Sequence, residues 1–130
     1  MNVQPEFQVI FKRLKRILQR FETDLVVQAN ASGNYSLNTP FSDAYAKEVF
    51  FGAVQVRKNY VSYHLMPVYV FPDLLEDISP NLKKRMHGKS CFNFKVLDQE
   101  TLEELERLTA RGIERFRQGH LLQTPNSHAK

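Results

Sequence analysis

The sequence predicts a single α+β domain: a two-layer sandwich in which an antiparallel sheet of four to five strands packs with an N-terminal and a C-terminal helix. Two observations predict it. Amphipathic helical patterns lie near both ends of the 130-residue chain, and short runs rich in Val, Phe and Tyr lie between them. The links between neighbouring runs are short, which favours antiparallel pairing of the strands.

The first helix is predicted over residues 6 to about 22, where apolar residues recur at every third or fourth position. Pro5 stands where a helix can begin, because a first-turn proline loses no needed hydrogen bond. The buried stripe comprises Phe7, Ile10, Phe11, Leu14, Ile17, Leu18 and Phe21. The opposite side is basic, and we expect it to be a solvated face, although such a helix is also compatible with an RNA or membrane surface.

Four strands are predicted in the first half of the chain, at residues 25–29, 35–38, 49–56 and 60–65. Gly33 marks the first turn, and Asn59 can supply a positive φ in the second hairpin. Gly52 inside the third strand indicates a bulge or a close backbone approach. Alternation places Phe50, Val54 and Val56 on one face and Val49, Phe51 and Ala53 on the other.

The second half of the chain continues with a short helical turn over residues 72–78. Ser79 and Pro80 are typical of a helix start, and we expect that helix to run through Met86 and end at Gly88. A strand over residues 90–96 then places Phe92, Phe94 and Val96 on one face.

Asp98 is predicted to cap the last helix, whose buried stripe comprises Leu102, Leu105, Leu108, Ile113 and Phe116. The acidic residues of this helix gather near its start and the arginines near its end, as the helix dipole favours. Residues 1–130 thus form one domain, of which about 118–130 are expected to be a flexible tail.

The composition excludes several classes of protein. The formal net charge is +4, but 14 acidic residues are mixed with the 18 basic ones, so a nucleic-acid partner is not expected. With a single cysteine, Cys91, the chain forms no internal disulfide. No apolar run approaches the roughly 20 residues that span a bilayer, and no secretory signal opens the sequence. We therefore expect a cytoplasmic protein without a membrane partner.

No catalytic residue or metal ligand is predicted. Gly88-Lys89-Ser90 resembles the end of a phosphate-binding P-loop, but Lys83 occupies the position of its first glycine. The four histidines do not share metal-ligand spacing with one another or with Cys91. A nucleophilic Cys91 would need a base within reach, and His87 lies only four residues away, but a small buried residue is the simpler interpretation.

Several short segments together resemble one protein family: Phe51-Gly52-Ala53, Lys58, the run from Tyr60 to His64, Gly88-Lys89-Ser90, and Phe92-Asn93-Phe94. They are similar to the YdhG-like family, a widespread bacterial domain family of unknown function, over about residues 6 to 117. The resemblance implies an α+β domain with an antiparallel sheet. The chain departs from the family pattern where Tyr60 replaces a common histidine, where Tyr63-His64 replaces an apolar-tyrosine pair, and where Asp98 replaces a proline.

The resemblance also implies an alternative function, because some members have been linked to intracellular iron handling by analogy with frataxin. Frataxin-like proteins hold iron weakly on acidic surface residues. The acidic residues available for iron here are Glu22, Asp24, Asp73, Glu76 and Asp77.

Our leading hypothesis is a binding module that holds a small anionic ligand or a protein partner on its exposed sheet face. Lysines would supply charge and the polar residues of one strand would supply hydrogen bonds; the predicted ligand-binding residues are Lys58, Tyr60, Ser62, His64, Lys89 and Ser90. The alternatives are a frataxin-like iron chaperone, a homodimer that buries the second sheet face, and an enzyme that uses His64 or Cys91.

Overall fold

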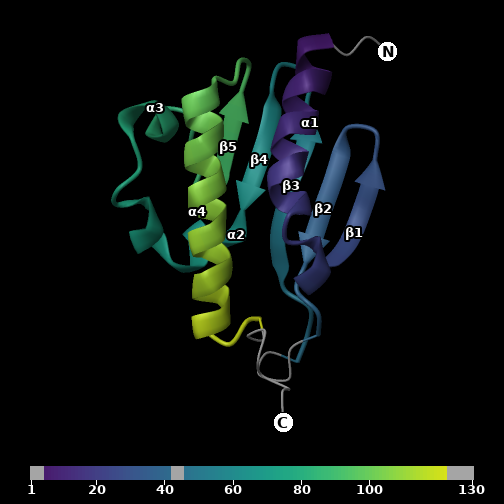
Figure 1. Cartoon of the computed structure of the whole chain (residues 1–130), viewed down its shortest axis with the longest axis vertical. Helices are drawn as coiled ribbons and strands as arrows, with labels where there is room; N and C mark the ends of the chain where they lie inside the picture. Colours follow the sequence, from purple (N-terminus) through teal and green to yellow (C-terminus); the bar gives the residue numbers. More distant parts are fainter. Residues whose placement is uncertain (1–4, 42–45, 123–130) are drawn as a thin grey trace.

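The computed structural model describes residues 5–41 and 46–122 (Figure 1). Its elements are α1 (Pro5–Gln19), the 3-10 turn η1 (Glu22–Asp24), β1 (Val26–Ala31), β2 (Asn34–Asn38), β3 (Phe50–Val56), β4 (Val61–Leu65), α2 (Met66–Val70), the 3-10 turn η2 (Pro72–Leu75), α3 (Pro80–Lys83), β5 (Cys91–Phe94) and α4 (Gln99–Gln118). The strands form one antiparallel sheet in the order β1-β2-β3-β4-β5. The predicted two-layer α+β sandwich is confirmed.

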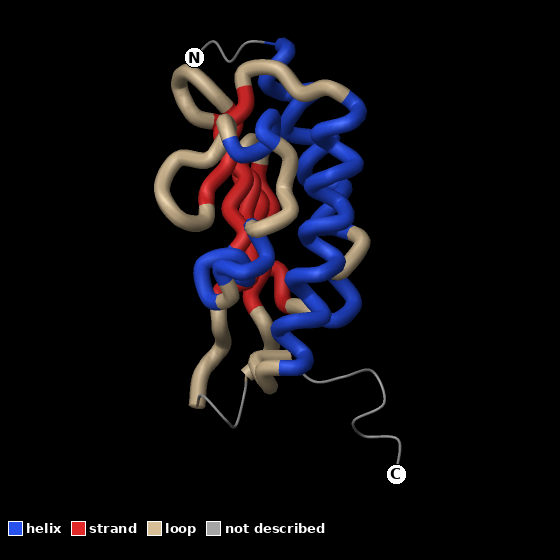
Figure 2. The backbone as a smooth tube through the Cα atoms, turned by 90° about the vertical axis from the view of Figure 1, so that its left-hand side faces the viewer, coloured by secondary structure: helices blue, strands red, loops and turns tan. Residues whose placement is uncertain are grey.

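The two long helices, α1 and α4, lie on the same side of the sheet (Figure 2). The strand register explains how they are anchored, because Tyr35, Val54, Tyr63 and Phe92 are paired in one row across four strands. All four side chains are fully buried. Residues next to this row along each strand point to the opposite face, since side chains alternate in a strand.

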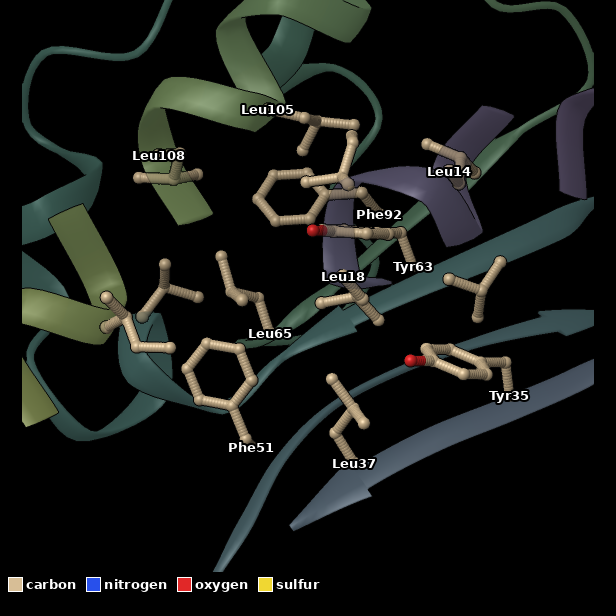
Figure 3. Packing of buried hydrophobic residues seen from close by; sticks show 14 of the residues in the cluster. Leu14, Leu18, Tyr35, Leu37, Phe51, Tyr63, Leu65, Phe92, Leu105 and Leu108 are labelled. Atoms are coloured by element: carbon tan, nitrogen blue, oxygen red, sulfur yellow. The ribbon is translucent and has the colours of Figure 1, made fainter. Parts of the chain in front are cut away.

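The core between the layers is dominated by aromatic and leucine side chains (Figure 3). Leu14 and Leu18 of α1 and Leu105 and Leu108 of α4 point toward the strands. One polar contact crosses this core: the hydroxyls of Tyr63 and Thr109 lie 2.6 Å apart, and both residues are buried. A hydroxyl pair of this kind fixes how α4 sits on the sheet, because each buried group satisfies the other.

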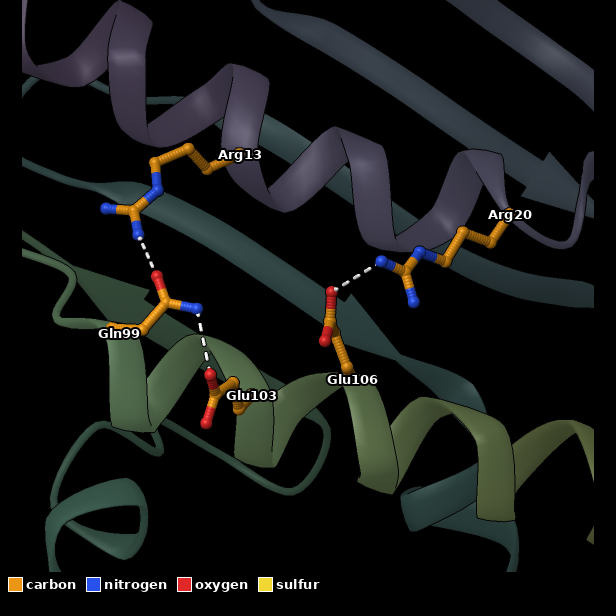
Figure 4. Close-up of polar contacts among 5 residues, drawn as sticks. All are labelled: Arg13, Arg20, Gln99, Glu103 and Glu106. Atoms are coloured by element: carbon orange, nitrogen blue, oxygen red, sulfur yellow. Dashed lines mark hydrogen bonds and ion pairs between the residues drawn. The ribbon is translucent and has the colours of Figure 1, made fainter.

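The basic side of α1 is used within the molecule. Arg13 donates to the carbonyl of Leu97 (3.1 Å) and to Gln99 (2.9 Å), and Arg20 lies 3.3 Å from the carboxylate of Glu106 (Figure 4). These contacts link α1 to the start and middle of α4. Each exposed pair contributes little by itself, but together they account for part of the basic face without an outside partner.

One predicted face assignment in β3 is wrong, and a bulge explains it. The pairing shifts between Leu37, opposite Gly52, and Asn38, opposite Phe50. Phe51 is therefore fully buried against Phe116 of α4, and Phe50 lies on the other face, beside His64. Gly52 makes the close approach that its position indicated: a Cβ there would lie 3.0 Å from the His64 carbonyl oxygen.

The connection between β4 and β5 differs most from the prediction. The chain turns directly from β4 into α2, which the sequence pattern did not indicate. Ser79 caps α3 as predicted, accepting a hydrogen bond from the Leu82 amide, but α3 ends at Lys83. Met86 instead bridges to Phe92 in β5, so Gly88, with φ +82°, lies in a hairpin turn and not at a helix end.

Both ends of α4 are well defined. Asp98 accepts a hydrogen bond from the Thr101 amide at 2.8 Å, which confirms the predicted cap. Val96, predicted to share a strand face with Phe92 and Phe94, lies beyond β5 and is 65% exposed. At the other end, Leu121 and Leu122 are buried in the core, although they fall at the start of the segment expected to be a tail. The remainder of that segment, from residue 123, lies outside the described residues.

Tyr63→Phe should lower the free energy of unfolding by about 1–2 kcal/mol, because it leaves the buried Thr109 hydroxyl without its partner. Thr109→Val should have a similar effect. The double variant should cost less than the two single changes added together, since the interaction can be lost only once. Urea unfolding of the four proteins measures this coupling, and strictly additive losses would show that the two hydroxyls do not interact.

Candidate functional site

The sheet face turned away from α1 and α4 carries mostly polar side chains, and we call it the open face. It is defined by two rows of paired residues. The first row is Asn34, Gln55, Ser62 and Asn93, and the second is Ser36, Ala53, His64 and Cys91. Both rows run across β2, β3, β4 and β5, so four strands position this surface.

Arg57, which follows β3 directly, supplies the charge at one end of the open face. Its guanidinium donates a short hydrogen bond to the Gln55 side chain, and Gln55 donates to Asn34 at 3.2 Å. Among the described residues, the hydrogen-bond partner of this guanidinium is therefore an amide and not a carboxylate. An arginine without a carboxylate partner retains its full attraction for an anion.

Ser62 lies in the middle of the first row and is only 2% exposed. Its hydroxyl is buried and makes no hydrogen bond of normal geometry with the described residues, although it lies close enough to the Cys91 thiol to lower the pKa of that group. Leaving a buried hydroxyl unpaired costs about 1–3 kcal/mol. A buried hydroxyl without a well-formed hydrogen bond is rare in a folded protein.

His64 and Cys91 form the polar pair of the second row. The His64 Nε2 and Cys91 Sγ atoms lie 3.6 Å apart, and the Cys91 thiol donates to Asn93 Oδ1 at 3.3 Å. Phe50 approaches the His64 ring edge-on, with 6.4 Å between ring centroids. Both members of the pair are only partly exposed, so they interact in an environment that is poorly hydrated.

The electrostatics keep this pair neutral. Burial raises the pKa of the Cys91 thiol, while the charge of Arg57 and the hydroxyl of Ser62 offset part of that rise. Burial also lowers the pKa of His64 below 6.5, and the charge of Arg57 lowers it further. Activated cysteine nucleophiles instead have a lowered thiol pKa. The pair is therefore suited to hydrogen bonding rather than to nucleophilic catalysis in its resting state.

The predicted ligand-binding residues are only partly brought together. Ser62 and His64 lie in β4 with their side chains on the open face, and Tyr60 precedes the strand with the same alternation. Lys58 lies in the turn before β4, whereas Ser90 accepts a backbone hydrogen bond from Leu65 at the far end of that strand. Lys58 and Lys89 thus lie near opposite ends of β4 and do not share one pocket.

Four contributing residues were not among those predicted: Gln55, Arg57, Cys91 and Asn93. Alternation along residues 53 to 57 would have placed Arg57 on the same face as Gln55. No comparable signal was available for β5, because its register against β4 depends on the 25 residues that separate the strands, numbers 66 to 90.

The acidic residues considered for iron lie elsewhere, and three of the five are engaged with arginines or a hydroxyl. Asp73 lies 2.6 Å from Arg115, Asp24 lies 2.9 Å from Arg117, and Glu22 accepts a short hydrogen bond from the Tyr35 hydroxyl. Within residues 5–41 and 46–122, no group of three or more His, Cys, Asp or Glu side chains could hold a metal ion.

Comparisons of the chain with protein-family models, with curated proteins and with solved structures found no match. The resemblance to the YdhG-like family therefore stays a prediction. In the part of the chain that the structure describes, no helix combines the length and the apolar character needed to cross a membrane.

The Cys91 thiol should react slowly with a disulfide reagent near neutral pH, compared with a free cysteine, because its raised pKa leaves little thiolate. Arg57→Gln should slow the reaction several-fold more, since it removes a charge that favours the thiolate. Absorbance at several pH values follows the rate, and Cys91 is the single thiol of the chain. Lys58→Gln is the matched control; an equal effect of both variants would show that Arg57 has no special relation to Cys91.

Proposed function

We propose that this chain is a small cytoplasmic binding module that holds an anionic small molecule on the open face. The observation that carries the proposal is the position of Arg57, a cation beside a surface of uncharged polar groups. None of the eight residues in the two rows bears a carboxylate. A carboxylate or phosphate group would complement this surface, because the planar guanidinium can bind either with two parallel hydrogen bonds.

The neighbouring side chains support a ligand of modest size. Gln55 and Asn93 flank Ser62 across the sheet and offer amide groups. The Ser62 hydroxyl between them is buried, so a ligand on this face would meet the two amides rather than the hydroxyl.

The proposal extends to the family relationship. The motifs between Phe51 and Phe94 that resemble the YdhG-like family include Ala53, Ser62 and Asn93, so part of the candidate site lies within the segments that carry the resemblance. This coincidence supports membership in a YdhG-like family whose shared surface is the open face.

Arg57→Gln should weaken binding of a small anion about tenfold or more, because one charge-assisted hydrogen bond to an ionised group contributes about 1.5–3 kcal/mol. Lys58→Gln, which removes the same charge one residue further along, should have a small effect. Titrations with sulfate, phosphate and citrate, followed by amide NMR shifts and by thermal unfolding, measure this difference.

Two outcomes would contradict the proposal. Equal weakening by the two variants would indicate attraction to net charge alone and not a site at Arg57. Saturable shifts confined to the acidic residues 73–77 in the presence of iron, with none at the open face for any anion, would favour the iron chaperone instead.

A further inference from the structure

We propose that anion binding on the open face is coupled to uptake of a proton by His64, so that the imidazolium and the Arg57 guanidinium together hold the bound anion. This inference rests on the proposed function and adds its regulation. It predicts a module that retains its ligand more tightly in mildly acidic solution and releases it as the pH rises.

The surroundings of His64 favour such a coupling. On β3 the side chain opposite is Ala53, which is small, and on β5 it is Cys91, whose thiol lies 3.6 Å from Nε2. Phe50 covers one edge of the ring. Its neighbour along β4 on this face is Ser62, which is uncharged. The imidazole therefore lies among neutral groups. None of them repels an incoming anion or already supplies a negative charge in its place.

The charges acting on His64 come from one source. Arg57 reaches toward the imidazole along the open face, because its guanidinium bonds to Gln55, which is paired with Ser62, the neighbour of His64 on this face. Among the described residues, Arg57 is the charged side chain that acts on the imidazole, and the titratable side chain in contact with it is Cys91. Neither is an acid that is ionised near neutral pH, so no carboxylate stabilises a protonated His64 in the free protein. An anion bound next to Arg57 would supply that missing negative charge.

The sign of the effect follows from the two states. In the free protein, burial and Arg57 hold the pKa of His64 below its ordinary value of 6.5. A bound anion neutralises the field of Arg57 and attracts the proton, so the pKa of His64 is higher in the complex. Linkage requires the reverse effect to be equal: protonation of His64 tightens anion binding by the same factor.

The pH window is set by these two pKa values. Affinity is lowest and constant above the pKa of the complex, rises as the pH falls toward the pKa of the free protein, and levels off below it. Each unit of difference between the two pKa values corresponds to a tenfold change in affinity. Because one group titrates, the logarithm of the dissociation constant changes by at most one per pH unit.

Sulfate is the probe for the test, because it remains a dianion throughout the range from about pH 5 to pH 8. The His64 ring protons are followed by NMR against pH in sulfate and in sodium chloride of equal ionic strength. We expect the His64 pKa to rise in sulfate, and sulfate to bind about three- to tenfold more tightly near pH 5 than near pH 8. His64→Gln should remove this pH dependence, while His120→Gln, at the far end of α4, should keep it.

The outcomes separate the two proposals. Sulfate shifts at Arg57 and Ser62 with an unchanged His64 pKa would overturn the proton coupling and leave the anion site standing. Absence of sulfate binding at every pH would overturn both. The NMR titration of His64 uses the unaltered protein, so the result does not depend on the folding of a variant.

Discussion

The structure depends on one constraint: both long helices pack on the same face of a five-stranded sheet. That face receives the aromatic row of Tyr35, Tyr63 and Phe92, together with the side chains from α1 and α4 that cover it. The Tyr63–Thr109 hydroxyl contact and the arginine contacts of α1 then fix where the two helices lie. Because both helices cover this face, side chains on the other face can be buried and hydrogen-bonded only by residues of the strands themselves.

On the open face, the strands bury and pair their own side chains. Small residues, Ala53 and Ser62, occupy the centre of the sheet and are buried by their larger neighbours. Around them, amide side chains bond to one another, as Gln55 does with Asn34. The Ser62 hydroxyl is the exception, because it is buried yet makes no hydrogen bond of normal geometry with the described residues. The open face is polar, its hydrogen-bonding groups are only partly paired, and it lies next to an arginine. It differs in this from an ordinary solvated sheet face, where water pairs every group.

Much of the fold was predictable from local pattern. The stripe of α1, the cap at Asp98 and the bulge at Gly52 each follow from a few neighbouring residues, and the structure confirms them. The faces around the bulge were not predictable, because where the extra residue falls depends on the partner strand: Phe51 turns inward to pack on Phe116, which is 65 residues away. Likewise, the short α3 and the hairpin at Gly88 result from the pairing of Met86 with Phe92. This tertiary contact outweighs the local sequence preference for a helix.

The same distinction applies to the candidate site. Ser62 and His64 were predictable as neighbours because they alternate along one strand, whereas Cys91 and Asn93 reach them only through the register of β4 and β5. Lys58 and Lys89 were predicted as site residues because they are charged and lie near turns. Those turns lie at opposite ends of β4, so the two lysines do not face the same groups. Basic residues in a sequence indicate a binding site only when the strand register shows that they face the same polar side chains. For this protein the cation that does so is Arg57.

The electrostatics of Arg57 also favour an anion over a cation as the ligand proposed for the open face. Its charge lowers the pKa of both His64 and Cys91, so it opposes a second positive charge at the imidazole and favours a negative one at the thiol. A metal cation bound there would meet the same repulsion, while the carboxylates suited to iron lie by other arginines, as Asp73 does beside Arg115. The proposed anion site and the carboxylates considered for iron therefore lie on different surfaces of the molecule. Because the field that repels a cation is the one that an anion neutralises, the proposed proton uptake at His64 follows from the proposed binding of an anion on the open face.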